Sequence, residues 1–211
     1  MAMIGAGSQA EFQALAFRGV LGVSRLRIYD VDPAASAKFV RNLAPRGFDI
    51  TVCASASEAA AGADIVTTCT ADKAVAQVLT DADVAPGMHI NTIGGDCPGK
   101  TELDPRILDR GPVFVEYTPQ TRVEGEIQNV AADFPVTEFW QVLNGMAAGR
   151  TSPEQVTIFD SVGFAIEDFS ALRHLRADLA GTGLDTEIDL VAAPEDPKDL
   201  FGFVTSPVPV A

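Results

Sequence analysis

The sequence predicts an α/β protein with a doubly wound parallel sheet and an extended C-terminal arm. Three observations predict this fold: a glycine-rich turn directly after the first apolar residues, strand-like runs that alternate with helical segments, and a proline-rich final stretch. Strands that alternate with helices indicate βαβ units, in which the strands run parallel. We therefore expect one α/β domain over residues 1–183 and the arm over residues 184–211.

The first element is a short apolar strand that runs into the turn Gly5-Ala6-Gly7-Ser8-Gln9-Ala10. From Glu11 to Gly22 the apolar residues recur at helical spacing, and the segment closes on a glycine. Strand, glycine turn and helix are the context in which the pattern G-x-G-x-x-A indicates a dinucleotide-binding domain. The opening of the chain therefore predicts a Rossmann domain.

Each position of this turn has its own part in binding a dinucleotide. Gly5 makes the tight turn, Gly7 lets the main chain approach a pyrophosphate, and Ala10 keeps the helix close to the strand. The free N–H groups and the positive end of the helix at Ser8 and Gln9 would bind the phosphates.

The later strands are expected where short runs of apolar and β-branched residues end in polar or glycine-rich turns. These runs are Arg25 to Tyr29, Asp49 to Cys53, Asp64 to Cys69, Met88 to Ile93, Val113 to Glu116 and Val156 to Phe159. Helices are expected at Pro33 to Leu43, Ser55 to Ala61, Pro135 to Leu143 and Phe164 to Leu179. The segment from Asp185 to Ala211 has four prolines and little helical periodicity, so it would wrap a neighbouring domain or be loose at its end.

Composition excludes several classes of function. A net charge of −14 argues against binding to nucleic acid or to anionic membranes, since both need a basic surface. The apolar runs are too short to span a bilayer, and the apolar start lacks the basic flank of a signal peptide. Three cysteines lie far apart without metal-ligand spacing, which is typical of cytosolic thiols. We therefore expect a cytoplasmic protein without a metal site.

Asp30 ends the second strand, 20 residues after Ala10. A carboxylate at this place hydrogen-bonds the adenosine ribose hydroxyls and would repel a 2′-phosphate. Val31 and Asp32 follow, where an arginine would favour that phosphate, so NAD is expected as the cofactor in preference to NADP. The alternative is that Asp30 only caps the helix that starts at Pro33.

Polar and glycine residues follow the fourth and fifth strands, at Thr70 and at Gly94-Gly95-Asp96. Open α/β sheets bind ligands at these carboxyl ends, near the switch in strand order. The nicotinamide is therefore expected near Ile93 to Gly95, with Asp96 placed to act as a general acid and base. The alternative is a turn aspartate that caps a helix near Thr101.

Three further features have both a functional and a structural interpretation. Lys100 could offset the charge of Asp96 or contact the cofactor, although a single lysine is more often solvated. Ser161 follows the seventh strand and could contact the nicotinamide amide or cap the helix before Phe164. A charged cluster is interpreted as a polar surface; its members are Glu116, Arg122, Glu124 and Glu126.

Taken together, several segments resemble the ornithine cyclodeaminase/μ-crystallin family over nearly the whole chain, most of all its bacterial ornithine cyclodeaminase branch. The most specific segment is Ile90-Asn91-Thr92-Ile93-Gly94-Gly95-Asp96-Cys97-Pro98-Gly99-Lys100-Thr101-Glu102-Leu103. The others are residues 4–9, 29–33, 67–73, 114–117 and 159–163.

The resemblance implies the roles of individual residues. It matches Asp96 to the family's catalytic aspartate and Val162 to a position beside the substrate. It also matches NAD-contacting positions to Ser8, Gln9, Asp30, Thr70, Ile93, Gly94, Gly95, Asp96, Lys100 and Ser161. The family reaction converts L-ornithine to L-proline and ammonia, and NAD is reduced and reoxidised within each turnover. The protein then orients the substrate and manages protons, while the cofactor supplies the redox chemistry.

The resemblance also implies a half-domain before the glycine turn, which carries substrate-carboxylate ligands and most of the homodimer interface. This chain is expected to be truncated relative to that pattern and to expose apolar surface as a result. Two alternatives to the cyclodeaminase remain open. The first is an amino-acid dehydrogenase or ketimine reductase that uses NAD or NADP. The second is an inactive NAD-binding fragment.

Overall fold

The computed structural model describes residues 1–71, 76–186, 198, 199 and 201. Its strands are β1 (Ala2–Ile4), β2 (Arg25–Tyr29), β3 (Asp49–Val52), β4 (Ile65–Thr68), β5 (His89–Thr92), β6 (Val113–Val115), β7 (Thr137–Glu138) and β8 (Thr157–Asp160). Its α-helices are α1 (Ala10–Leu21), α2 (Pro33–Leu43), α3 (Ala56–Ala60), α4 (Thr118–Glu124), α5 (Phe139–Leu143) and α6 (Ala165–Leu179). Short 3₁₀ helices lie at η1 (Ala44–Arg46), η2 (Asp81–Asp83), η3 (Pro105–Arg110) and η4 (Glu126–Asn129).

These strands form one sheet in the order β3-β2-β1-β4-β5-β8-β6-β7, and every neighbouring pair runs parallel. The chain moves outward from β1 in one direction to β2 and β3, and then in the other direction to β4 and β5. This reversal at β1 is the switch point at which open sheets of this kind bind ligands. The predicted doubly wound parallel sheet is confirmed.

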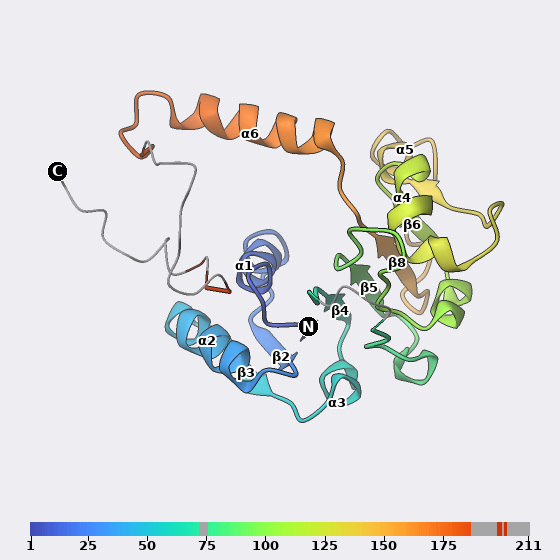
Figure 1. Ribbon diagram of the computed structural model, residues 1–211, viewed down its shortest axis with the longest axis horizontal. Helices are drawn as coiled ribbons and strands as arrows, with labels where there is room; N and C mark the ends of the chain where they lie inside the picture. Colours follow the sequence, from blue (N-terminus) through green and yellow to red (C-terminus); the bar gives the residue numbers. More distant parts are fainter. Residues whose placement is uncertain (72–75, 187–197, 200, 202–211) are drawn as a thin grey trace.

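The helices on either side of the sheet follow from the alternation of side chains along the strands. Met3 and Ile28 pack against the apolar faces of α1 and α2, where Phe39 and Leu43 are fully buried. Ile4 belongs to the opposite core, which contains residues of α3, η3 and η4. Figure 1 shows α1 and α3 on opposite sides of the sheet.

The local sequence explains where the first two helices begin and end. Helix α1 stops at Gly22, whose φ of 71° is a left-handed conformation that favours glycine. Helix α2 begins at Pro33, directly after Asp32, whose carboxylate accepts the Ala34 N–H at 2.9 Å. Both helices lie close to the ranges expected from the sequence.

One predicted helix is wrong in its first half. The segment Pro135 to Leu143 is helical only from Phe139, because Thr137 and Glu138 form β7. That strand pairs with β6 at the edge of the sheet, in the register Phe114 with Thr137. Edge pairing with a strand 23 residues earlier has overridden the local helical spacing.

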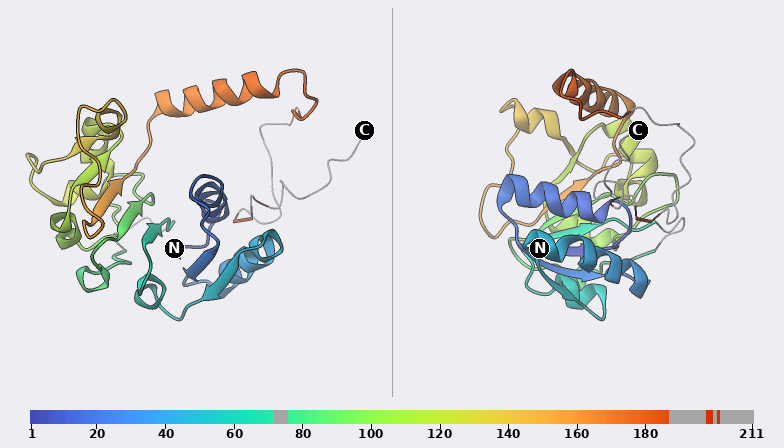
Figure 2. Two further views of the ribbon diagram at one scale, coloured as in Figure 1. Left: turned by 180° about the vertical axis from the view of Figure 1, so that it is seen from behind. Right: turned by 90° about the vertical axis from the view of Figure 1, so that its left-hand side faces the viewer.

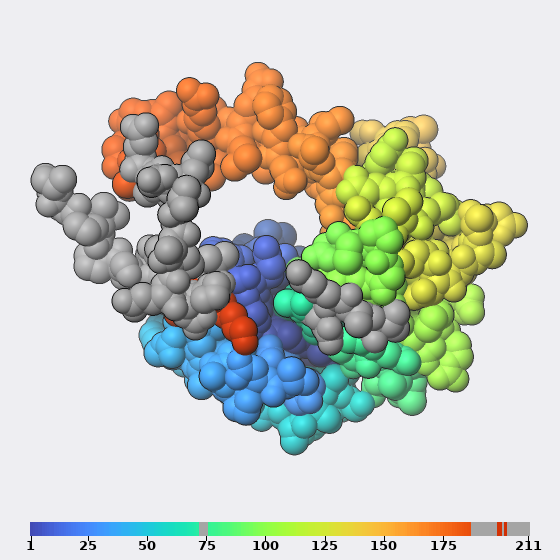
Figure 3. All heavy atoms as spheres, in the orientation of Figure 1, coloured from blue at the N-terminus to red at the C-terminus, as the bar shows by residue number. Residues whose placement is uncertain are grey.

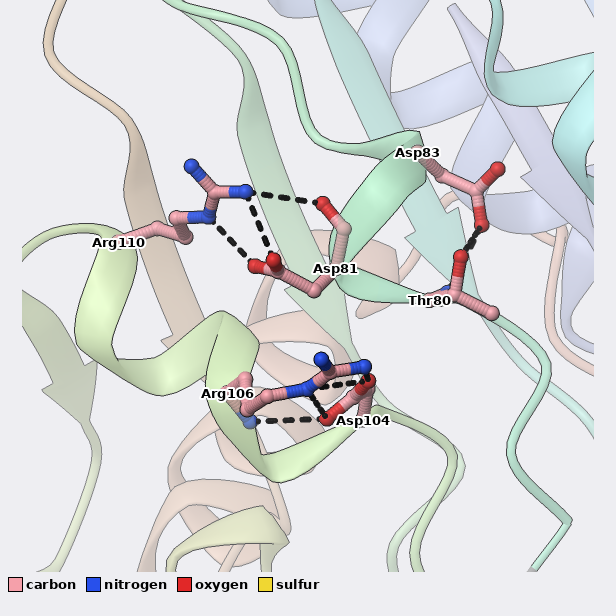
Figure 4. A network of polar contacts seen from close by, with 6 residues as sticks. All are labelled: Thr80, Asp81, Asp83, Asp104, Arg106 and Arg110. Carbon is pink, nitrogen blue, oxygen red and sulfur yellow. Dashed lines mark hydrogen bonds and ion pairs between the residues drawn. The ribbon is translucent and has the colours of Figure 1, made fainter.

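Ion pairs stabilise the segments that join β4 to β5 and β5 to β6, which contain η2 and η3 (Figure 4). Arg110 in η3 donates to the Asp81 carboxylate at 2.5 and 2.8 Å. Arg106 donates to Asp104, whose carboxylate also accepts the main-chain N–H of Arg106 and thereby caps η3. The Arg110–Asp81 pair joins η3 to η2, whereas the Arg106–Asp104 contacts are local to the start of η3.

Helix α6 stands apart from the rest of the domain, as Figures 1 and 2 show. No residue of this helix is buried, and Ile166 and Phe169 are 70% and 61% exposed. Figure 3 shows the opening between α6 and α1. Large apolar side chains are also exposed elsewhere, for example Val20 and Leu143, as expected from the sequence.

The described residues of the C-terminal arm contact α1 and α2. Phe201 is 1% exposed and packs edge-on against Phe12, with ring centroids 5.6 Å apart. Lys198 forms an ion pair with Asp32 at 2.9 Å. The rest of the arm beyond residue 186 lies outside the described residues, so the expected division of the chain at residues 183 and 184 stays a prediction.

No helix in the described part of the chain is both long enough and apolar enough to cross a membrane.

Candidate functional site

A cavity of about 540 Å³ lies at the carboxyl ends of β1, β2 and β4, over the switch point of the sheet. Five of the residues predicted to bind the cofactor line it: Gly5, Gly7, Ser8, Asp30 and Thr70. Tyr29, Cys69 and Lys198 complete part of its wall. The sequence therefore identified the residues on three strands that the fold brings to one cavity.

The glycine turn has the geometry that its sequence requires. Gly5 has a φ of 94°, and a Cβ at this position would lie 2.6 Å from the carbonyl oxygen of Cys69. A side chain is therefore excluded by the close approach of β1 to β4. Gly7 differs, because a Cβ there would meet no atom of the chain within 4 Å. The space beside Gly7 is open to the cavity.

Asp30 connects the glycine turn to the end of β2. Its Oδ2 atom accepts the Ala6 N–H at 2.6 Å, and its Oδ1 atom accepts the Asp32 N–H at 2.8 Å. The alternative that Asp30 caps α2 is wrong, because the Asp32 side chain performs that task. Asp30 orients the turn and presents a carboxylate to the cavity.

A buried ion pair that sequence analysis missed lies directly behind the turn. Glu11 in α1 and Lys38 in α2 are 0% and 4% exposed, and the Lys38 Nζ atom lies 2.7 Å from Glu11 Oε1. The same ammonium donates to the Gly7 carbonyl oxygen at 3.2 Å. A lysine and a glutamate in amphipathic helices usually suggest solvated surface, so the local sequence carries no signal for this contact.

Buried carboxylates also gather beneath the ends of β4, β5 and β8. Glu102 accepts hydrogen bonds from residues that follow β4 and β5, while Glu126 accepts the main-chain N–H groups of Glu102 and Leu103 at 2.6 and 3.0 Å. Asp160 accepts the N–H groups of Glu126 and Ile127 at 2.9 and 3.0 Å. The three carboxylates thus fix a series of neighbouring loops.

The interpretation of Glu126 as part of a polar surface is wrong, because this residue is 2% exposed. Burial raises the pKa of Glu126 from 4.5 to about 8, even though two main-chain N–H groups favour the charged form. Burial likewise raises the pKa of Asp160 from 3.8 to about 7. Local sequence does not reveal the burial of Glu126, because it depends on the packing of η4 through contacts distant in sequence.

Asp96 lies on the loop after β5 and is exposed. Its carboxylate pairs with Lys100, at 3.1 Å between Oδ1 and Nζ, while the lysine side chain is only 5% exposed. This is the charge compensation expected for Lys100, and the lysine is not the solvated side chain of the alternative. The helix near Thr101 that Asp96 could have capped is absent from the described chain, where η3 begins at Pro105.

Ser161 and Val162 lie directly after β8, where both contact Glu116. The Ser161 hydroxyl donates to a Glu116 carboxylate oxygen, and the Val162 N–H donates to the other oxygen at 3.2 Å. The alternative that Ser161 caps α6 is wrong, since Phe164 occupies the N-cap position without a side-chain bond. Glu116 is therefore an orienting residue for this loop.

Other predicted cofactor residues lie outside the lining of the cavity within the described chain: Gln9, Ile93, Gly94, Gly95, Asp96, Lys100 and Ser161. Gln9 precedes α1, and the others follow β5 and β8, farther along the same edge of the sheet. Gly95 lies in a close approach, because a Cβ there would be 3.0 Å from the Glu124 carbonyl oxygen. Their roles as ligands of a cofactor stay predictions.

The parallel sheet, its reversal at β1 and the glycine turn beneath a cavity define an α/β protein of the dinucleotide-binding class. The sequence model of the ornithine cyclodeaminase/mu-crystallin family matches residues 1–183. The chain belongs to this family.

Curated relatives differ in activity. An ornithine cyclodeaminase of Brucella suis is 59% identical over 204 residues, which are 97% of this chain and 57% of the relative. An alanine dehydrogenase of Archaeoglobus fulgidus is 37% identical over 177 residues, covering 81% of this chain and 53% of the relative. The chain therefore spans little more than half the length of the curated relatives that it matches.

Solved structures share the fold. A lysine cyclodeaminase, described as recognising L-lysine, L-ornithine and L-2,4-diaminobutyric acid, aligns with a TM-score of 0.80 at 33% identity. The alignment covers 95% of this chain and 58% of that one. An archaeal alanine dehydrogenase dimer with bound NAD aligns with a TM-score of 0.77 at 32% identity, over 89% of this chain and 59% of that one.

Proposed function

We propose that this chain binds NAD and carries the cofactor-dependent part of an ornithine cyclodeaminase reaction, the conversion of L-ornithine to L-proline and ammonia. The observation that carries this proposal is the cavity over Gly5 and Gly7, with the Asp30 carboxylate on its wall. The open space beside Gly7 fits a pyrophosphate, and no side chain caps the N-terminus of α1 at Gln9, so N–H groups of its first turn could bind the phosphates.

The reaction needs no external oxidant or reductant. Oxidation at the α-carbon gives an imine, the δ-amine of the substrate adds to that carbon, ammonia leaves, and the cyclic imine is reduced to proline. Bound NAD would accept the hydride and then return it. Asp96 would move protons during addition of the amine and loss of ammonia, and Lys100 would balance its charge in the meantime.

Three readouts on the full chain with L-ornithine and a catalytic amount of NAD test this proposal: ammonia, proline and NADH absorbance. The expected result is equal amounts of ammonia and proline without lasting NADH. The variant Asp96→Asn should lose product while it still binds NAD. Asp109→Asn, a change at an exposed aspartate in η3, serves as the matched control.

The second candidate is an amino-acid dehydrogenase or ketimine reductase, which the 37% identity to an archaeal alanine dehydrogenase supports. Amino-acid oxidation would leave one NADH for each product, so NADH that accumulates with ornithine or alanine favours this candidate. NAD binding without any product favours a cofactor-binding fragment. Neither outcome agrees with a cyclodeaminase that is active in this form.

The family resemblance also supports a cytoplasmic location, and the resemblance together with one solved relative supports a homodimer as the working form. The archaeal alanine dehydrogenase with bound NAD is described as a dimer. Sedimentation velocity on the purified chain tests whether these residues alone form the dimer, and a monomer at all concentrations would show that they do not.

A further inference from the structure

Glu102 lies between two loops: the loop after β4, where Thr70 lines the cavity, and the loop after β5, which contains Gly94. Its side chain is 1% exposed and accepts hydrogen bonds from both loops. Oε1 accepts the main-chain N–H and the hydroxyl of Thr70, each at 2.7 Å. Oε2 accepts the Gly94 N–H at 2.9 Å and the Thr68 hydroxyl at 2.6 Å. One carboxylate therefore connects the chain after β4 to the chain after β5.

The main chain at Gly94 lies so close to the Glu102 carboxylate that only glycine fits at this position. A Cβ on Gly94 would lie 2.2 Å from the Glu102 carboxyl carbon. Any side chain at this position would displace the carboxylate or the loop. The donors named above are uncharged, so their geometry, rather than an opposite charge, determines where the carboxylate lies.

The contact with Thr70 determines what its hydroxyl can bind. A hydroxyl has one proton to donate and two lone pairs to accept with. Thr70 donates that proton to Glu102, so its oxygen offers only lone pairs to the cavity that it lines. A ligand group beside Thr70 must therefore be a donor, such as a ribose hydroxyl or a carboxamide N–H. NAD carries both in its nicotinamide riboside half.

A second carboxylate fixes the main chain of Glu102. Glu126 accepts the Glu102 N–H at 2.6 Å and the Thr92 hydroxyl at 3.1 Å. Glu126 also accepts the Leu103 N–H at 3.0 Å, so its carboxyl group fixes the main chain on both sides of the Glu102 peptide.

We propose that Glu102 is a positioning residue of the NAD site: it fixes the loops at Thr70 and Gly94 and makes the Thr70 hydroxyl an acceptor for the nicotinamide riboside half of the cofactor. This inference rests on the proposed function, since it presupposes that the cavity binds NAD. It adds a residue that touches no ligand and acts through Thr70 and Gly94.

The test compares the affinities of the full chain for NAD and for ADP, which lacks the nicotinamide riboside. Glu102→Gln keeps the shape of the side chain but replaces one acceptor oxygen by a donor. NAD affinity should fall about tenfold or more, as expected when a hydrogen bond to a charged group is lost, while ADP affinity changes less than about twofold. Glu154→Gln, at an exposed position before β8, should change neither affinity.

Two variants of Thr70 keep the test valid if Glu102→Gln does not fold. Thr70→Val removes the acceptor hydroxyl and should weaken NAD binding without weakening ADP binding. Thr70→Ser keeps a hydroxyl and should bind NAD as the wild type does. Two results would overturn the inference: NAD affinity unchanged in Glu102→Gln, or NAD and ADP affinities that fall together in Thr70→Val. A wild-type chain that binds neither nucleotide contradicts the proposed function itself, which separates the two failures.

Discussion

Lys38 and Glu11 form an ion pair in the interior of the protein, 2.7 Å apart, where α2 packs against α1 behind the glycine turn. Glu11 also accepts the Asn42 side-chain N–H at 3.2 Å. Because the Lys38 ammonium also donates to the Gly7 carbonyl oxygen, this pair supports both the packing of α1 against α2 and the main chain of the glycine turn.

Removal of one partner of this pair should be strongly destabilising, because it leaves an uncompensated charge in the interior. We expect Lys38→Met and Glu11→Gln each to lower the free energy of unfolding by about 3–5 kcal/mol. The double variant should lose much less than the sum of the two single losses. Urea unfolding of the wild type, the two single variants and the double variant gives the coupling free energy between Lys38 and Glu11. Additive losses would contradict the ion pair.

The two glycines of the turn should respond differently to alanine. Gly5→Ala combines a positive φ with a 2.6 Å contact to the Cys69 carbonyl oxygen, so it should destabilise the fold by about 1–3 kcal/mol. Gly7→Ala should change the unfolding free energy by less than about 0.5 kcal/mol, since its Cβ meets no atom of the chain.

Gly7→Ala, which should hardly change stability, should strongly weaken the binding of NAD. In Gly7→Ala the new methyl group occupies the space expected for the pyrophosphate, so NAD affinity should fall by about tenfold or more. Thermal unfolding measures the predicted effects on stability, and NAD titration of the same preparations measures the predicted effect on affinity. A Gly7→Ala protein that binds NAD like the wild type would show that the pyrophosphate lies elsewhere.

Asp30 should determine both affinity for NAD and discrimination against NADP. Asp30→Asn places an amide N–H₂ group against the N–H of Ala6 or Asp32 and removes the charge that would repel a 2′-phosphate. We expect NAD affinity to fall by about tenfold, and the ratio of NADP to NAD affinity to rise. Titration with each nucleotide gives the ratio. Equal affinities in the wild type would contradict this role for Asp30.

The buried carboxylates predict how stability depends on pH. The pKa values of Glu126 and Asp160, about 8 and about 7, lie above their ordinary values of 4.5 and 3.8. The folded chain therefore keeps protons that the unfolded chain has released, and the resulting stabilisation, complete at low pH, is lost as pH rises through 7 and 8. Melting temperature should fall as pH rises from about 4 to about 8 and should level off above that range.

Glu126→Gln isolates the contribution of one group. A glutamine cannot ionise, so the fall in melting temperature over this range should be smaller in the variant than in the wild type. Glu154→Gln, which changes the charge by the same amount at an exposed position, is the control. Parallel curves for wild type and Glu126→Gln would show that Glu126 does not titrate in this range.

The sequence predicted those parts of the fold and site that local constraints determine. The turn at Gly5 and Gly7 is recognisable because glycine meets demands of conformation and space within a few residues. The start of α2 at Pro33 is equally local, since proline suits the first turn of a helix. Asp30 was found because it lies at a characteristic distance from the turn, at the end of β2.

The parts that sequence reasoning missed depend on distant packing. Glu102 contacts Thr70 across 32 residues, and Glu126 contacts Thr92 across 34. Each looks like ordinary solvated glutamate in its own segment, and only the assembled sheet places it under the loops. The edge strand β7 was missed for the same reason, because its partner β6 lies outside its local sequence window.

Calorimetric titration of the full chain and of Gly7→Ala with NAD shows whether the glycine turn binds the cofactor. We expect one NAD bound per wild-type chain, and an affinity at least about tenfold lower in a Gly7→Ala protein that melts at the wild-type temperature. A folded wild-type chain that does not bind NAD, or a Gly7→Ala protein that binds it unchanged, would contradict binding of NAD at the glycine turn.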